Sequence, residues 1–267
     1  LEFRRVLFRS NYIGQATCVT KYKDEIYIGT EKGIFVKKAG KDHIGADVSS
    51  PYLEYFDDKS IRHMNVDSKG NLWVCTNDSN GLVEVTSDGQ YEFYRSEDSE
   101  GVANRYVMTI ELSDGRIAAA TLNGVYIYKN GELEEVFDSD DGMEVPQINC
   151  LLETDDKKLL CCSDGGGVYV FRSGKMIEHI DSREGLTSQV VLRAARCKEG
   201  YIYVTSNALF YDDRNSVHKL SNFPYSNNFD AYLTETGNLW VASRAGLYVV
   251  KAEDAVKDAI NNLGGYD

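Results

Sequence analysis

Proline, positive charge and long apolar runs are all scarce in this sequence. Only 3 of its 267 residues are proline, while 23 are glycine and 18 are tyrosine. Lys and Arg number 29 against 42 Asp and Glu, so the net charge is −13 and the basic stripe that nucleic acid requires is missing. No apolar run reaches the eighteen residues that would span a bilayer. The abundance of Gly and Tyr predicts many short strands joined by tight turns.

The first ten residues differ in character from the rest. The segment 1–10, LEFRRVLFRS, carries three Arg in an otherwise acidic chain. Its Leu-Glu, Glu-Phe and Leu-Phe-Arg-Ser steps are typical of translated restriction sites and sequencing adapters. We interpret residues 1–10 as a cloning or adapter remnant and exclude them from the fold. A native basic segment is the alternative. The lack of a signal peptide therefore says nothing about location.

A seven-residue pattern recurs six times along the chain. It ends each time in a hydroxyl residue, which we call the anchor, and a turn and a second apolar run follow. The anchors are Thr30, Thr76, Thr121, Ser163, Ser206 and Ser243, which lie 37 to 46 residues apart. Six matches in phase indicate an internal repeat.

Each repeat divides into four strand-sized pieces. In the second repeat they are 61–66, 72–75, 82–85 and 91–94. Four short antiparallel strands in about 40 to 45 residues form the blade of a β-propeller, whereas a helical solenoid would need longer amphipathic runs. The sequence predicts an all-β propeller over residues 11–252 with six visible blades. A seven-bladed ring in a parent protein and a closed six-bladed ring both stay open.

The last fifteen residues break this pattern. The segment 253–267 begins with apolar residues at helical spacing and sits where an inter-blade insert would. We expect it to be a truncated inter-blade segment.

Two motifs resemble a known family. One is Asp-x-x-Gly-Asn-Leu-Trp-Val at 67–74; the other is a Gly and an apolar residue ahead of inner strands, at 101, 142 and 185. Together they resemble the two-component regulator propeller, over residues 12–252. Only the second and sixth repeats carry the family's Trp. The family supplies extracytoplasmic sensor domains of bacterial hybrid histidine kinases and of some diguanylate cyclases.

The resemblance implies a non-catalytic, ligand-sensing domain of a bacterial membrane-anchored signalling receptor, placed in the periplasm or outside the cell. Such a domain would bind a small molecule or glycan, or form a homodimer, and pass the change to an output domain of the parent chain. It implies no cofactor. The alternatives are a propeller lyase or glycosidase acting on a polysaccharide, and a protein-interaction scaffold.

Propellers bind ligands where their inner strands begin and the inter-blade loops converge. Polar residues at these starts suit a hydroxylated or anionic ligand, although they also suit a merely solvated channel. The candidate ligand-binding residues are Arg62, His63, Arg105, Tyr106, Gln147, Gln189, Arg193 and Asp230.

Other candidate sites do not fit their chemistry. The six Cys lack the spacing of a metal site, and the four His are scattered. The acidic loop 138–144 lacks the EF-hand period, and Gly165–Gly167 lacks the Lys of a phosphate loop. We therefore predict no metal site and no catalytic pair, and we expect buried thiols that act as small apolar residues.

Overall fold

The computed structural model describes residues 15–37, 45–46, 53–77, 81–95, 105–197, 199–221, 223 and 227–261. The expectation for residues 1–10 lies outside these ranges, as does His43. The chain divides into two compact units, which are described separately. Residues 7–136 make up the N-terminal unit, and residues 137–267 make up most of the C-terminal unit.

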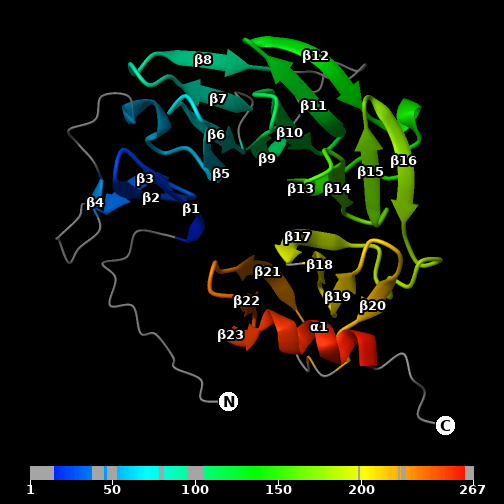
Figure 1. The fold of residues 1–267 in the computed structure, drawn as a ribbon. Coiled ribbons are helices and arrows are strands. Elements are labelled where there is room, and N and C mark those ends of the chain that lie inside the picture. The colour runs from blue at the N-terminus through cyan, green and yellow to red at the C-terminus, as the bar shows by residue number, and fades with distance from the viewer. Residues whose placement is uncertain are drawn as a thin grey trace. The chain divides into compact units, whose positions relative to one another are not determined.

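The N-terminal unit contains three four-stranded antiparallel sheets, blades 1 to 3 (Figure 1). Blade 1 consists of β1 Ala16–Tyr22, β2 Glu25–Thr30, β3 Gly33–Lys37 and β4 Gly45–Ala46. A short 3-10 helix, Glu54–Phe56, precedes blade 2. Blade 2 consists of β5 Ile61–Val66, β6 Leu72–Thr76, β7 Leu82–Val85 and β8 Tyr91–Tyr94. Blade 3 consists of β9 Tyr106–Glu111, β10 Ile117–Thr121, β11 Gly124–Lys129 and β12 Glu132–Phe137.

The C-terminal unit contains blades 4 to 6. Another 3-10 helix, Ser139–Asp141, lies in the acidic loop before blade 4. Blade 4 consists of β13 Ile148–Glu153, β14 Leu159–Ser163, β15 Val168–Arg172 and β16 Lys175–Ile180. Blade 5 consists of β17 Val191–Cys197, β18 Gly200–Thr205, β19 Leu209–Asp212 and β20 Val217–Lys219. Blade 6 consists of β21 Asn228–Leu233, β22 Asn238–Ser243 and β23 Gly246–Lys251, and helix α1 follows at Ala252–Asn261.

The predicted antiparallel blades are confirmed, but the described residues of blade 6 form three strands where four were expected. Strands β5 to β8 match the four pieces expected for the second repeat to within one residue. Strands pair in the order of the chain in all six sheets that the described residues form. The helical spacing expected after residue 252 is also present, as α1.

The anchor hydroxyls close the turns between second and third strands. Thr30 Oγ1 donates to the Gly33 carbonyl at 3.0 Å, and Thr121 Oγ1 donates to the Gly124 carbonyl at 2.9 Å. In blade 5 the predicted anchor Ser206 is wrong by one residue. Thr205 makes the equivalent bond, to the Ala208 carbonyl at 3.0 Å. Its backbone pairs with Val191, as each true anchor pairs with the start of an inner strand.

Small residues before the anchors let neighbouring blades approach closely. A Cβ added to Gly29 would come within 2.5 Å of Cys18 Sγ and 2.7 Å of Ile61. Cys75 and Cys162 hold the same position in blades 2 and 4 and are fully buried. The cysteines form no disulfide among the described residues. Cys75, Cys150, Cys161 and Cys162 are buried, and their thiols fill space in the core.

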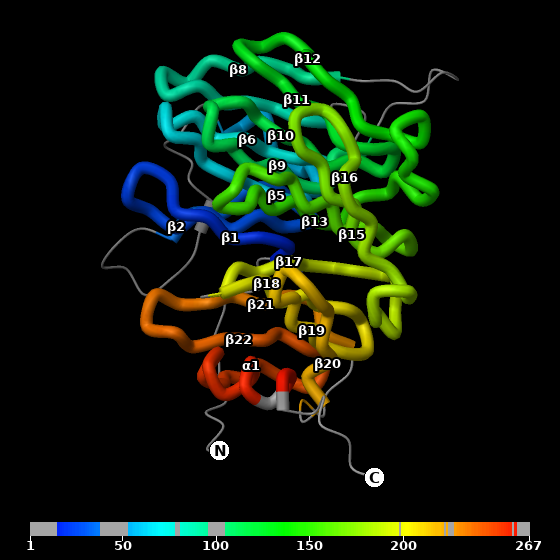
Figure 2. The backbone as a smooth tube through the Cα atoms, turned by 45° about the vertical axis from the view of Figure 1, so that its right-hand side comes forward, coloured from blue at the N-terminus to red at the C-terminus, as the bar shows by residue number. Residues whose placement is uncertain are grey.

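Helix α1 belongs to the core of the C-terminal unit. Its residues Ala252, Ala255 and Ala259 are buried with Ile202 of β18 and Leu239 of β22. Figure 2 shows α1 alongside β22 and β20. Among the described residues, no helix is long and apolar enough to cross a membrane.

Candidate functional site

The four candidate residues of the N-terminal unit lie where β5 and β9 begin. Arg62 and His63 are half-buried on β5, and Arg105, just before β9, is exposed. The Thr109 backbone N–H donates to His63 Nδ1 at 3.4 Å, which holds the imidazole between the two inner strands. Arg62 and Arg105 therefore supply two positive charges at one end of these blades.

Tyr106 differs from the other three. Its side chain is fully buried, and its hydroxyl lies 2.6 Å from the Tyr128 hydroxyl. It packs in a cluster with Trp73 and Ile117. The residue faces the core between blades 2 and 3, so it offers no exposed surface to a ligand.

In the C-terminal unit the candidate Gln147 binds a carboxylate, that of Asp164. Gln147 Nε2 donates to Asp164 Oδ2 at 2.7 Å, and Asn149 Nδ2 donates to Asp164 Oδ1 at 3.1 Å. Asp164 follows the anchor Ser163 at the end of β14, so the turn after the anchor faces the start of β13. This brings two polar side chains from the start of β13 onto one acceptor.

Arg193 continues this network into the next blades. Its Nη1 donates to the Asn149 carbonyl at 3.2 Å, and its Nε donates to Asp230 Oδ1 of β21 at 3.2 Å. The resulting chain of contacts, which we call the polar network, crosses blades 4, 5 and 6. Gln189 is exposed and its side chain bonds elsewhere, to Ser182 Oγ at 3.4 Å.

Arg193 also lies against a buried thiol pair. Cys150 and Cys162 are directly opposite each other on β13 and β14 and share a hydrogen bond. That bond lowers the pKa of the Cys150 thiol, burial opposes the shift, and the Arg193 guanidinium adds to it. For Arg193, burial lowers the pKa, but Cys150 and Asp230 raise it by more. The guanidinium is thus held charged at the centre of the polar network.

The sequence identified most of this network but missed Asp164. That residue stood only as the start of a glycine turn, Asp164-Gly-Gly-Gly167. Its place directly after an anchor is the signal that links it to the neighbouring inner strand. In blades 1 to 3 the residues directly after the anchors are Glu31, Asn77 and Leu122.

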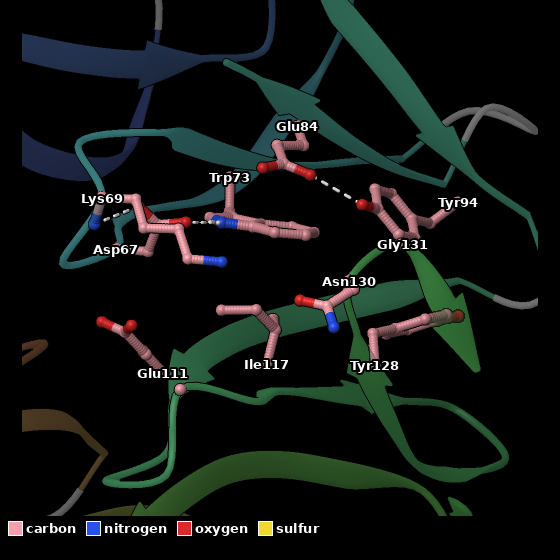
Figure 3. Close-up of a pocket in the computed structure, with 11 residues that line it drawn as sticks. Asp67, Lys69, Trp73, Glu84, Tyr94, Glu111, Ile117, Tyr128, Asn130 and Gly131 are labelled. Atoms are coloured by element: carbon pink, nitrogen blue, oxygen red, sulfur yellow. Dashed lines mark hydrogen bonds between the residues drawn. The ribbon is translucent and has the colours of Figure 1, made fainter. Parts of the chain in front are cut away.

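A pocket of about 110 Å³ lies elsewhere, between blades 2 and 3 of the N-terminal unit (Figure 3). In this view Trp73 extends from one wall, and Ile117, Asn130 and Tyr128 line the opposite wall. Its lining residues are Asp67, Lys69, Trp73, Glu84, Tyr94, Glu111, Gly115, Ile117, Tyr128, Asn130 and Gly131. They include residues of the first turns of blades 2 and 3. These turns follow β5 and β9, whereas Arg62 and Arg105 lie where the same strands begin.

The carboxylates of this pocket mainly hold the blade together. Asp67 accepts from Trp73 Nε1 at 2.9 Å and from the Asn71 backbone N–H at 2.8 Å. Glu84 accepts from the Tyr94 hydroxyl at 2.6 Å. Burial raises the pKa of Glu84, while the bond from Tyr94 opposes that shift. The described residues hold no cluster of three or more ligands suited to a metal ion.

Part of this wall is also where the sequence matches a family. Residues 55–78 match the two component regulator propeller. The resemblance predicted from the motifs is thereby confirmed. The match contains Asp67 and Trp73, whose hydrogen bond joins the first turn of blade 2 to β6. No match was found among curated proteins.

Solved structures with similar folds include two extracellular domains described as parts of hybrid two component systems of B. thetaiotaomicron. For BT3049 the TM-score is 0.75 at 16% identity, covering 93% of this chain and 34% of that one. For BT4673 the TM-score is 0.56 at 12% identity, covering 94% and 48%. Virginiamycin B lyase from Staphylococcus aureus matches with a TM-score of 0.55 at 12% identity, covering 90% and 94%.

These similarities establish the fold alone, because sequence identities this low do not carry a function from one protein to another. The chain has the β-propeller fold, with six blade sheets in the described residues. It spans about a third of the length of the BT3049 domain.

Proposed function

We propose that this chain is the ligand-sensing, non-catalytic propeller part of a bacterial membrane-anchored signalling receptor of the histidine kinase or diguanylate cyclase type. The main support is the similarity to the BT3049 extracellular domain over 93% of the chain, together with the family match at residues 55–78. In this proposal the chain lies outside the cytoplasm and acts on an output domain of the parent protein, alone or as a homodimer.

The proposed ligand is a small molecule or glycan with hydroxyl or anionic groups. Its proposed contacts at the inner-strand starts of the N-terminal unit are Arg62, His63 and Arg105. Those of the C-terminal unit, taken by itself, are Gln147, Gln189, Arg193 and Asp230. Arg193 supports this proposal most directly, because its contacts join three blades. A ligand that competes for the Arg193 guanidinium would loosen its bond to Asp230 and so change the packing of blade 6 against blade 5.

The proposal includes a seven-bladed ring in the parent protein. Blade 6 has five large exposed apolar side chains, Phe229, Tyr232, Trp240, Leu247 and Val249. Such a group is unusual on a free surface and suits a further sheet packed against it. A structure of a longer parent protein in which Trp240 stays exposed would contradict a seventh blade there.

A binding screen tests the sensing proposal. A panel of neutral and anionic oligosaccharides is titrated calorimetrically against the protein and the variants Arg62→Ala, Arg105→Ala and Arg193→Ala. We expect loss of one charged hydrogen bond to weaken binding by about tenfold or more. Arg172→Ala, at the end of β15, is the matched control and should bind normally. Equal binding by all four variants would reject the site.

The same screen separates a sensor from an enzyme. Similarity to virginiamycin B lyase shows a shared fold at 12% identity and carries no active site over to this chain. Each ligand that binds is incubated with the protein and analysed by mass spectrometry. A sensor returns it unchanged. Cleavage products at a rate above the protein-free control would overturn the non-catalytic proposal.

A further inference from the structure

Blade 6 has an open strand edge. In the part of the chain that the structure describes, its sheet has three strands, and β23 pairs with β22 alone. The other five sheets each have a fourth strand. After β23 the chain enters α1, whose alanines pack into the core beside Ile202.

Strand β11 of blade 3 is the counterpart of β23 in a blade whose third strand is paired with a fourth. Its sequence Gly124-Val-Tyr-Ile-Tyr-Lys129 aligns without a gap with Gly246-Leu-Tyr-Val-Val-Lys251 of β23. Both strands follow a two-residue turn after the anchor, and both pair with their second strand in the same register. Strand β11, however, is covered by the fourth strand β12, Glu132–Phe137.

The contacts of β12 define the chemistry of a suitable strand. Lys129 Nζ lies 3.5 Å from Glu134 Oε1, so the charge at the end of β11 is paired. Phe137, at the end of β12, is buried, while the first three residues of β12 are exposed. Blades 2 and 4 repeat this pattern, with Tyr94 opposite Leu82 and Ile180 opposite Val168. The fourth strands of blades 2 to 4 therefore share a buried aromatic or large aliphatic residue at their last position.

The side chains of β23 that correspond to buried or paired residues of β11 are exposed. Leu247, the counterpart of the fully buried Val125, is 54% exposed. Val249 is 36% exposed, and Lys251 is exposed as well. Ser243 and Gly246 pair across a two-residue hairpin. Because the closing pair of such a hairpin is a hydrogen-bonded one, alternation turns the N–H and C=O groups of Leu247 and Val249 away from β22. Such an edge is a template for another strand.

We propose that β23 binds an extended polypeptide strand as the fourth strand of blade 6. The bound strand runs antiparallel to β23, pairs with the outward groups of Leu247 and Val249, and carries an acidic residue near Lys251. It places a large aromatic or aliphatic residue opposite Leu247, as Tyr94 lies opposite Leu82 and Ile180 opposite Val168. This is strand addition to a sheet edge, with backbone bonds giving affinity and one side chain giving specificity. It is independent of ligand sensing.

The test uses a peptide that copies β12 and its flanks, GELEEVFD, added to the intact chain. Binding is measured by amide hydrogen exchange of β23 and by titration of amide NMR signals. We expect slower exchange at Leu247 and Val249. A peptide with Ser in place of Phe should bind about tenfold more weakly or worse, because burial of the ring is lost.

Variants of the edge decide the outcome. Val249→Pro removes one outward N–H and should abolish binding, whereas Val249→Ala keeps it and should bind nearly as the parent does. Leu247→Ser tests the apolar contact without touching the backbone, and thermal melting confirms that each variant is folded. Unchanged exchange at millimolar peptide, or equal binding by Val249→Pro, would overturn the proposal. A dimer detected by sedimentation, in which the β23 strands of two copies pair with each other, would also overturn the proposal.

Discussion

Blades 2 and 6 contain the same five residues, Gly-Asn-Leu-Trp-Val, in the same place. In blade 2 the tryptophan, Trp73, is 4% exposed, whereas in blade 6 Trp240 is 38% exposed. The local backbone is alike: Gly70 and Gly237 both have a positive φ and both donate to the residue three before them. The short sequence therefore sets the turn and the strand, and neighbouring elements set the burial.

Trp73 packs in a buried cluster with Ile117 and Tyr128 of blade 3, and two contacts within blade 2 add to its burial. Trp73 lies 5.0 Å from the ring of Tyr94, which the fourth strand of blade 2 supplies. Its indole N–H donates to Asp67, whereas blade 6 has Thr234 at the equivalent position. The hydroxyl of Thr234 accepts from the Asn238 backbone N–H at 3.0 Å and lies 2.9 Å from the Thr236 hydroxyl, all within the turn. Blade 2 is thus tied together by side chains that blade 6 lacks.

The largest expected effect comes from removing each tryptophan in turn. Trp73→Ala should lower the free energy of unfolding by about 3–5 kcal/mol, because it empties a buried site. Trp240→Ala should cost roughly 1 kcal/mol or less, because its ring is partly solvated already. Urea denaturation followed by circular dichroism measures both. Similar losses for the two variants would show that blade 6 is covered in solution.

A smaller effect is expected at the first turn. Asp67→Ala leaves the buried Trp73 indole N–H and the turn amides without their acceptor, which should cost about 1–3 kcal/mol. Thr234→Ala removes a single hydroxyl from the corresponding turn and should cost about 1 kcal/mol. The two values come from matched urea curves. A larger loss for Thr234→Ala would mean that the Asp67 network adds little.

The smallest effect concerns pH. Burial raises the pKa of Glu84, so the folded state holds this proton more tightly than the unfolded state does. The stabilisation is therefore complete below the ordinary glutamate pKa and is lost as pH rises through the folded value. Glu84→Gln cannot titrate, so the parent should gain stability over this variant between about pH 7 and about pH 4.

Thermal melts across this pH range measure the difference. Glu132→Gln, at an exposed position of β12, is the control and should follow the parent. A constant difference between the parent and Glu84→Gln at every pH would contradict the raised pKa.

The sequence pattern predicted the positions of strands far better than it predicted the burial and contacts of individual side chains. Periodicity located β5 to β8 because alternating apolar residues and glycine turns are local properties. It misplaced the anchor of blade 5 because Thr205 and Ser206 are adjacent hydroxyls, and only the bond to Ala208 distinguishes them. The exposure of Trp240 was also beyond its reach, since burial depends on what packs against a face.

For the candidate site too, the sequence predicted positions along strands but not the burial or contacts of side chains. The position of Arg193 at the start of an inner strand could be read from the repeat, and its contact with Asp230 joins two predicted residues. The burial of Tyr106 on β9 could not, because its partner Tyr128 lies on β11, 22 residues further along the chain. Asp164 was missed because its role comes from residues about 15 positions earlier in the same blade, Gln147 just before β13 and Asn149 on β13.

The order of strands within each sheet has a consequence for how the chain folds. Every ladder joins strands that are consecutive in the chain, so pairing partners are separated by short loops. Low sequence separation reduces the entropy lost before native contacts form, and it favours rapid formation of individual blades. Gain or loss of one whole blade then leaves the pairing inside every other blade intact, which allows such chains to vary in blade number during evolution.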